Sequence, residues 1–175
     1  MFVVDLQLTG ASKLKDSVVN EIIRESLRDV GEYWHEHMLP KHFTKAGARE
    51  YGYTPRRGEP GSGRAFKGSY TAHKLKKKGH ALPLVYSGET RQRLLSTKSI
   101  EARTVRRGAR AHVTIRLNAP QLNQNSSKVK KHEEIRKVSH GELNTLANYL
   151  VSRIEMRLTA AGKANAAGLA SITAG

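Results

Sequence analysis

The side chains best suited to chemistry in this chain are lysines and arginines, and they are concentrated in one segment. Residues 40–83 hold eleven of the 31 Lys and Arg but only two glutamates, so this segment carries +9 of the net charge of +16. Lys and Arg bind phosphate and carboxylate groups, and aromatic side chains among them add stacking or packing. The segment also contains Tyr51, Tyr53, Phe66 and Tyr70. This composition predicts contact with a polyanion, most commonly a nucleic acid.

A run of histidines near the end of the first predicted helix offers a second kind of chemistry. His35, Glu36 and His37 are followed closely by His42. A zinc-protease motif needs two histidines four residues apart on one helix face, with a glutamate between them. His35 and His37 are two residues apart and point to different sides of a helix. We therefore expect surface or partly buried histidines, with no metal site and no cofactor.

Carboxylates and hydroxyls form no catalytic pattern that we recognise. The adjacent Glu133 and Glu134 lie in a basic stretch, where charge balance explains them. The glycines of residues 58–63 lack the Gly-Lys-Ser/Thr and the preceding strand of a phosphate-binding loop. We therefore expect no enzymatic activity. A nuclease assembled from scattered His and Lys side chains is the alternative.

Length and composition limit the class of protein further. A chain of 175 residues predicts one domain with a core of its own, here residues 1–161. The chain has no cysteine, so we expect neither a disulfide framework nor thiol chemistry. No stretch approaches the roughly 18 apolar residues of a membrane helix, and the N-terminus lacks the pattern of a signal peptide. We therefore expect a soluble protein that does not bind a membrane.

Hydropathy patterns locate the elements that position these side chains. Apolar and polar residues alternate over residues 2–9, which predicts a strand. From about Ser12 or Asp16 to Leu39, apolar residues recur at three- and four-residue steps, which predicts an amphipathic helix ended by Pro40. A short helix is expected through Leu94.

The second half of the chain predicts a hairpin and another long helix. Residues 100–104 and 110–117 alternate like strands, and a loop with Arg106, Arg107 and a glycine joins them. Residues 118–138 form a polar loop. Ser139 and Glu142 have capping-box spacing, and the apolar stripe that follows predicts a helix ending near residue 162. Residues 162–175 are expected to be a flexible tail.

Together these elements predict an α+β fold in a single domain. A small antiparallel sheet, made from the N-terminal strand and the hairpin, is packed by two long helices. Residues 40–83 form a long, extended basic arm. Exposed sheet edges would invite pairing with a neighbouring subunit.

A motif-like set of residues lies in the middle of the chain, between Tyr70 and Ser96. Its members are Tyr70, Lys74, Pro83, Leu84, Ser87, Gly88 and Leu94. This motif resembles the virion-morphogenesis and tail-completion (neck) proteins of tailed bacteriophages, and a broader likeness extends over residues 12–160. One departure is Thr90, followed by a basic residue, where an apolar residue is usual.

The resemblance implies a structural virion protein at the head–tail junction. Such a protein would form a homo-oligomeric ring, six- or twelve-fold, that joins the connector to the tail terminator or tail tube. It would surround the channel through which genomic DNA passes and would be assembled in the host cytoplasm. Non-specific contact with DNA or neighbouring proteins is expected from Arg56, Arg57, Arg64, Lys67, Lys74, Lys76, Lys77, Lys78, Arg106 and Arg107.

A rival hypothesis follows from the charge alone. A non-specific DNA- or RNA-binding accessory protein, such as a nucleoid-type or ribosome-associated factor, would have the same basic composition. It would bind duplex DNA tightly at low salt, with a steep salt dependence. A neck protein needs only weak binding, because tight binding would hinder passage of the genome.

Overall fold

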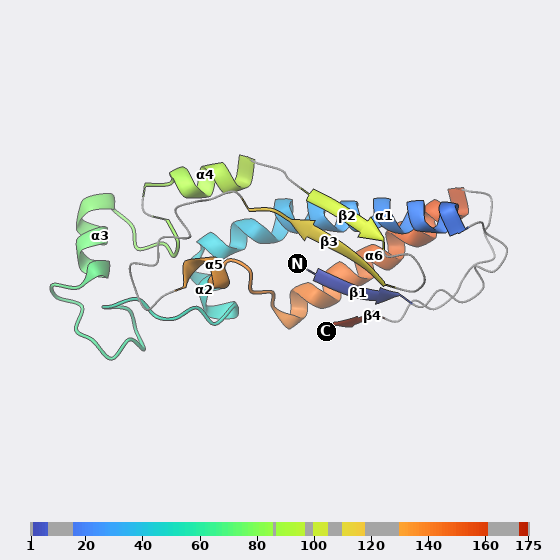
Figure 1. The fold of residues 1–175 in the computed structure, drawn as a ribbon. Coiled ribbons are helices and arrows are strands. Elements are labelled where there is room, and N and C mark those ends of the chain that lie inside the picture. Colours follow the sequence, from blue (N-terminus) through green and yellow to red (C-terminus); the bar gives the residue numbers. More distant parts are fainter. Residues whose placement is uncertain are drawn as a thin grey trace. The chain divides into compact units, whose positions relative to one another are not determined.

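The structure, a computed structural model (Figure 1), divides into two compact units. The first unit holds Met1–His35, Lys98–Arg116 and His140–Gly175, and the second holds Glu36–Thr97 and Leu117–Ser139. The sequence predicts one domain over residues 1–161. The residues that the structure describes are 2–6, 16–85, 87–96, 100–104, 110–117, 130–160 and 172–174.

Two long helices form the core of the first unit. Helix α1 (Asp16–Tyr33) packs against helix α6 (His140–Ala160). Their apolar side chains recur at helical spacing, and burying each one stabilises the fold by about 1.5–3 kcal/mol relative to leaving it exposed. The buried side chains are Ile22, Ile23, Leu27 and Val30 on α1, and Leu146, Leu150, Ile154 and Leu158 on α6.

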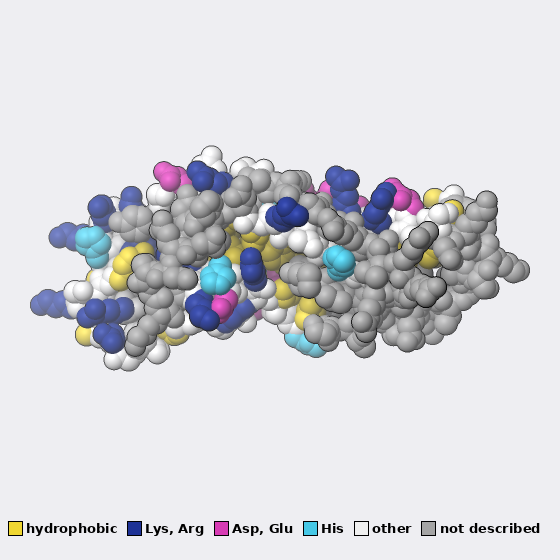
Figure 2. Space-filling model, viewed as in Figure 1, with side chains coloured by type: hydrophobic (Ala, Val, Ile, Leu, Met, Phe, Trp, Pro, Cys, Tyr) yellow, Lys and Arg dark blue, Asp and Glu magenta, His cyan; other side chains and the backbone are white. Residues whose placement is uncertain are grey.

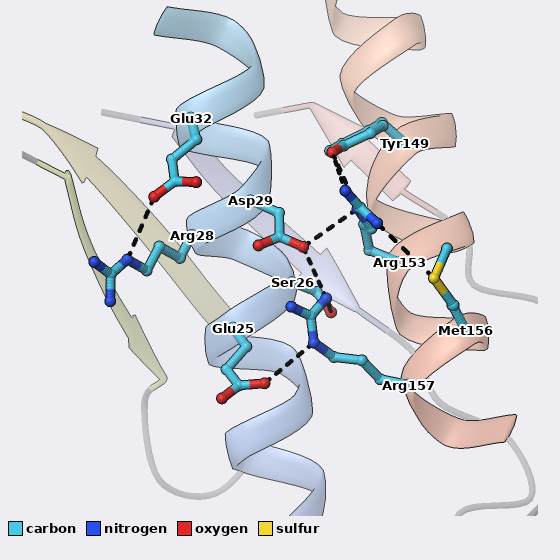
Figure 3. A network of polar contacts seen from close by, with 9 residues as sticks. All are labelled: Glu25, Ser26, Arg28, Asp29, Glu32, Tyr149, Arg153, Met156 and Arg157. Carbon is cyan, nitrogen blue, oxygen red and sulfur yellow. Dashed lines mark hydrogen bonds and ion pairs between the residues drawn. The ribbon is translucent and has the colours of Figure 1, made fainter. Parts of the chain in front are cut away.

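A network of polar contacts also joins these two helices (Figure 3). Arg157 of α6 binds Glu25 at 3.1 Å and Asp29 at 2.9 Å. Arg153 binds the same Asp29 at 3.2 Å and lies 5.0 Å from the centre of the Tyr149 ring. Hydrogen bonds to Asp29 and Glu25, with the charge of Asp29, raise the pKa of Arg157 despite partial burial. The shared carboxylate fixes how the two helices are aligned.

Short strands pair beside α1. They are β1 (Phe2–Leu6), β2 (Ile100–Thr104), β3 (Arg110–Ile115) and β4 (Ile172–Ala174). Their order is β2-β3-β1-β4, and all neighbours are antiparallel. In the register, β3 places Val113 opposite Ala102 on one side and Phe2 on the other. Helix α1 contacts β2 and β3.

These strands do not make the protein an α+β fold, and the fold class that we predicted is wrong. The part of the chain that the structure describes is mostly helical. Helices α1 and α6 have 18 and 21 residues, whereas the longest strand has six. The alternating patterns indicated where strands could form, but they overestimated the share of the structure that strands contribute. Short helices also occur where an extended arm and a polar loop were predicted.

Residues 40–83 show the largest difference from the prediction, because they are not an extended arm. A π-helix, η2 (Trp34–Met38), continues from α1 and is followed by the 3-10 helix η3 (Leu39–Phe43). Helices α2 (Lys45–Glu50) and α3 (Tyr70–Lys78) lie further along the segment. Its side chains also enter the core of the second unit: His42, Phe43, Tyr51 and Tyr53 are buried.

The second unit is completed by α4 (Glu89–Ser96) and α5 (Lys131–Glu134). Helix α5 lies within the predicted polar loop 118–138, of which residues 118–129 fall outside the described part. The predicted tail 162–175 contributes β4, and its other residues are likewise outside that part. Among the described residues, we find no helix that combines the length and the apolar character needed to cross a membrane.

Candidate interaction surface

Helix α3 is a short helix with both ends capped. At its N-terminus, Ser69 Oγ accepts a hydrogen bond from Ala72 N at 3.1 Å. At its C-terminus, Gly79 adopts φ 70° and its N–H donates to Leu75 O at 2.9 Å, as in a left-handed helix cap. Three lysines in the last turn, residues 76–78, complement the negative end of the helix dipole. The caps explain why so basic a sequence is helical here.

Two side chains on the inner face of α3 attach it to the chain before and after it. Thr71 Oγ1 donates to Arg57 O at 2.9 Å. Lys74 is buried and its Nζ donates to Leu82 O. Burial lowers the pKa of Lys74, with Glu59 opposing and Arg56 adding to that effect. We call this set of contacts the α3 clasp.

The family-like residues Pro83 to Leu94 continue from the clasp. Pro83 is buried in a turn in which Leu84 adopts φ 55°, an unusual conformation for a residue other than glycine. Gly88 adopts φ 90°, and its carbonyl accepts a hydrogen bond from Gln92 N in the first turn of α4. Leu94 of α4 is 1% exposed. These motif residues therefore position the backbone, and of them only Ser87 and Tyr70 are exposed.

A largely buried ion pair attaches the middle of the basic segment to α5. Arg56 Nη1 and Nη2 donate to the two carboxylate oxygens of Glu134 at 2.9 and 2.5 Å. The two side chains are 15% and 5% exposed. Glu134 Oε1 also accepts from Thr54 N at 3.1 Å. Arg56 and Lys74, both predicted as partner contacts, are thus engaged inside this unit.

An aromatic cluster lies next to this pair. His42 Nδ1 is 2.5 Å from Tyr53 Oη, and the Tyr51 ring stacks on His42 with centroids 3.9 Å apart. Burial lowers the pKa of His42 to about 4, although a backbone hydrogen bond involving Glu134 opposes the shift. Within the part of the chain that the structure describes, no three metal-binding side chains of His, Asp or Glu come together.

The other predicted contact residues within the second unit are exposed, namely Arg57, Arg64, Lys67, Lys76, Lys77 and Lys78. Arg106 and Arg107 lie outside the described residues. Figure 2 shows Lys and Arg side chains gathered over the region of α3, with a histidine and hydrophobic side chains among them. Phe66 and Tyr70 are 51% and 48% exposed. We define the basic surface as Arg64, Phe66, Lys67, Tyr70, Lys76 and Lys77.

Sequence reasoning missed the residues that hold this surface in place. Glu134 was interpreted as charge balance, because its partner Arg56 is 78 residues away and no local pattern connects them. His42 was interpreted as a surface or partly buried histidine, whereas it is completely buried. Ser69, directly before a helical stretch, was a cap signal that the sequence offered.

No family model, curated protein or solved structure matches this chain.

Proposed function

We propose that this protein is a structural subunit of the phage head–tail junction. It forms a neck or tail-completion ring that joins the connector to the tail around the DNA channel. In this role the protein binds and positions other virion proteins and catalyses no reaction. Its site of action is the assembled virion.

The α3 clasp is the observation that supports this proposal best. Lys74 and the Pro83–Leu84 turn are motif-like residues, and the hydrogen bond from Lys74 to Leu82 O connects them directly. A buried lysine is used here to fix the path of the backbone, which is a structural use of a basic side chain. The spacing of the motif that resembles the neck proteins is explained by this contact: a long side chain on α3 donates a hydrogen bond to the backbone just before the Pro83–Leu84 turn.

The basic surface lets the ring subunit contact negatively charged groups of its neighbours. Its charges are exposed, so they interact with phosphate or carboxylate groups without base-specific recognition. Such contacts are long-ranged at low salt and are screened beyond about 8 Å at physiological ionic strength. Weak, non-specific binding of this kind suits a channel through which DNA must move.

The native mass of nuclease-treated protein, measured at high and at moderate salt with negative-stain imaging, tests the proposal. We expect rings, or masses at six or twelve times the 19.4 kDa chain, without bound nucleic acid. A monomer that takes up duplex DNA tightly as the salt concentration falls would contradict the proposal. That result would favour the nucleic-acid-binding accessory protein instead.

A further inference from the structure

We propose that the basic surface docks an acidic segment of a different protein, and that this segment carries apolar side chains which pack on Phe66 and Tyr70. The inference rests on the proposed function and names the chemistry of the neighbour at this site. We expect this segment to bind the basic surface more tightly than duplex DNA does, and we expect a second copy of this chain not to bind there.

Within the described part of the chain, no carboxylate neutralises the charges of the basic surface. Among the described residues, no carboxylate forms an ion pair with any of the four basic side chains, Arg64, Lys67, Lys76 and Lys77. All four side chains are exposed, and three of them lie on or next to α3, so their charges add. An uncompensated cluster of this kind attracts a partner of opposite charge.

A second copy of the chain is poorly suited to supply that charge. The chain has 15 acidic residues against 31 basic ones. Many of the described carboxylates are already used within their own unit: Glu25 and Asp29 bind Arg157, and Glu134 binds Arg56. Two copies meeting at the basic surface would bring like charges together, which opposes association. The acidic partner is therefore another molecule.

Exposed apolar side chains distinguish a protein partner from duplex DNA. Phe66, Tyr70 and Leu75 are each about half exposed, at 51%, 48% and 44%. The outside of a DNA duplex presents phosphates and sugars, which give an exposed phenyl ring little to pack against. Protein interfaces instead combine aromatic anchors with a charged rim, and the anchors contribute most of the binding energy.

The geometry of α3 places aromatic and basic groups on one face. Tyr70, His73 and Lys77 follow one another at steps of three and four residues, so they share a face of the helix, and all three are exposed. The clasp residues Thr71 and Lys74 are buried beside this face, and Lys74 follows Tyr70 by four residues. Lys74 Nζ lies 5.9 Å from the centre of the Tyr70 ring. This contact with a buried side chain favours one orientation of the ring, which reduces the entropy lost when a partner binds.

Three labelled probes test the inference with the full-length protein in solution. The first is an acidic peptide that contains Leu and Phe, the second is the same peptide with Ser in place of Leu and Phe, and the third is a duplex DNA. We expect the first peptide to bind about tenfold more tightly than the second, a difference of about 1.4 kcal/mol. The double variant Phe66→Ser/Tyr70→Ser removes this difference and leaves DNA binding unchanged.

Two further variants act as controls. Lys76→Gln/Lys77→Gln weakens binding of all three probes, because it removes charge. Val18→Ser removes a side chain on α1 that is 39% exposed, and leaves all three affinities unchanged. Melting temperatures confirm that each variant is folded. Tighter binding of DNA than of either peptide, or unchanged peptide affinity in Phe66→Ser/Tyr70→Ser, would overturn the inference.

The test is independent of ring formation. Peptide binding is measured on whatever oligomer the protein forms, so a protein that binds the apolar acidic peptide but never assembles contradicts only the proposed function. A protein that forms rings but prefers DNA contradicts only the inference about the partner.

Discussion

His42 is the residue whose protonation is most closely tied to the stability of the second unit. Its ring is buried between Tyr51 and Tyr53, and burial lowers its pKa from 6.5 to about 4. The unfolded chain therefore binds a proton at a higher pH than the native protein does. Stability is complete above about pH 6.5 and is lost as the pH falls toward about 4, by roughly 3 kcal/mol in total.

Urea unfolding at a series of pH values between 7 and 4.5 measures this effect. His42→Gln is expected to flatten the decrease in unfolding free energy between pH 6.5 and 4.5. The matched control, His37→Gln, replaces an exposed histidine and should keep the decrease. Equal slopes for the wild-type protein and His42→Gln would show that this histidine does not control the acid sensitivity.

The ion pair between Arg56 and Glu134 is a second prediction at the residue scale. Both side chains are largely buried, so removing one partner leaves an uncompensated charge in the interior. Arg56→Met is expected to destabilise the protein by about 3–5 kcal/mol, whereas Arg56→Met/Glu134→Leu recovers much of that loss. Arg57→Met is the control, because Arg57 is exposed. Denaturant midpoints that are equal for Arg56→Met and Arg57→Met would contradict the structural role.

At the scale of elements, the loop before α3 depends on one closely packed glycine. A Cβ atom on Gly58 would lie 2.0 Å from Ser69 Oγ, the side chain that caps α3. Gly63 also has positive φ, at 65°, but a Cβ atom there meets nothing within 4 Å. Gly63→Ala should therefore cost about 1–2 kcal/mol from backbone strain alone. Gly58→Ala should cost clearly more and also loosen α3.

Thermal unfolding and hydrogen exchange of the α3 amides measure the two glycine variants. The expected pattern is a lower melting temperature and faster exchange in α3 for Gly58→Ala than for Gly63→Ala. If both variants lose the same stability, the contact between this loop and the helix cap is not a determinant of the fold.

The polar network between α1 and α6 gives a prediction for the first unit. Asp29 forms ion pairs with both Arg153 and Arg157 (Figure 3). Its side chain is only 22% exposed. Asp29→Asn is expected to destabilise the protein by about 1–2 kcal/mol, because partly buried Arg153 loses its carboxylate partner and Arg157 keeps only Glu25. Glu21→Gln, which disrupts an exposed pair with Arg24, should change stability by less than about 0.5 kcal/mol. Urea midpoints that do not differ between the two variants would contradict this.

How well each element could be predicted depended on whether its cause is local. Helices α1 and α6 were predictable because burial of one face leaves a period of three and four residues in the sequence. The helices of the basic segment were not predicted, because its glycines and prolines suggested an extended chain. In the structure, positive φ values at Gly58 and Gly79 instead allow tight turns between helical pieces.

The candidate site was predictable only in part, for the same reason. Exposure of Arg64 and Lys77 follows from charge, and the sequence identified both. Lys74 was predicted in the same group, yet it points inward, because its partner is a backbone carbonyl that no side-chain pattern indicates. Arg56 and Glu134 are 78 residues apart in the chain, so their ion pair could be found only in the folded structure.

At the scale of the whole molecule, the net positive charge limits how copies of the chain can assemble. The net charge of +16 opposes self-association unless partners or DNA compensate it. A ring of such subunits is therefore expected to be salt-sensitive, and a neighbouring protein or the genome must supply negative charge. In the proposed position between connector and tail and around DNA, the chain would have both neighbouring proteins and the genome as sources of negative charge.

Interruption of the coding sequence in the genome that carries it tests the central claim most directly. Electron microscopy of the particles produced would then show whether heads and tails are joined. We predict heads without attached tails, and complementation by the intact chain should restore complete particles. Joined, normal particles in the absence of this chain, or a genome that yields no phage particles at all, would contradict the assignment to the head–tail junction.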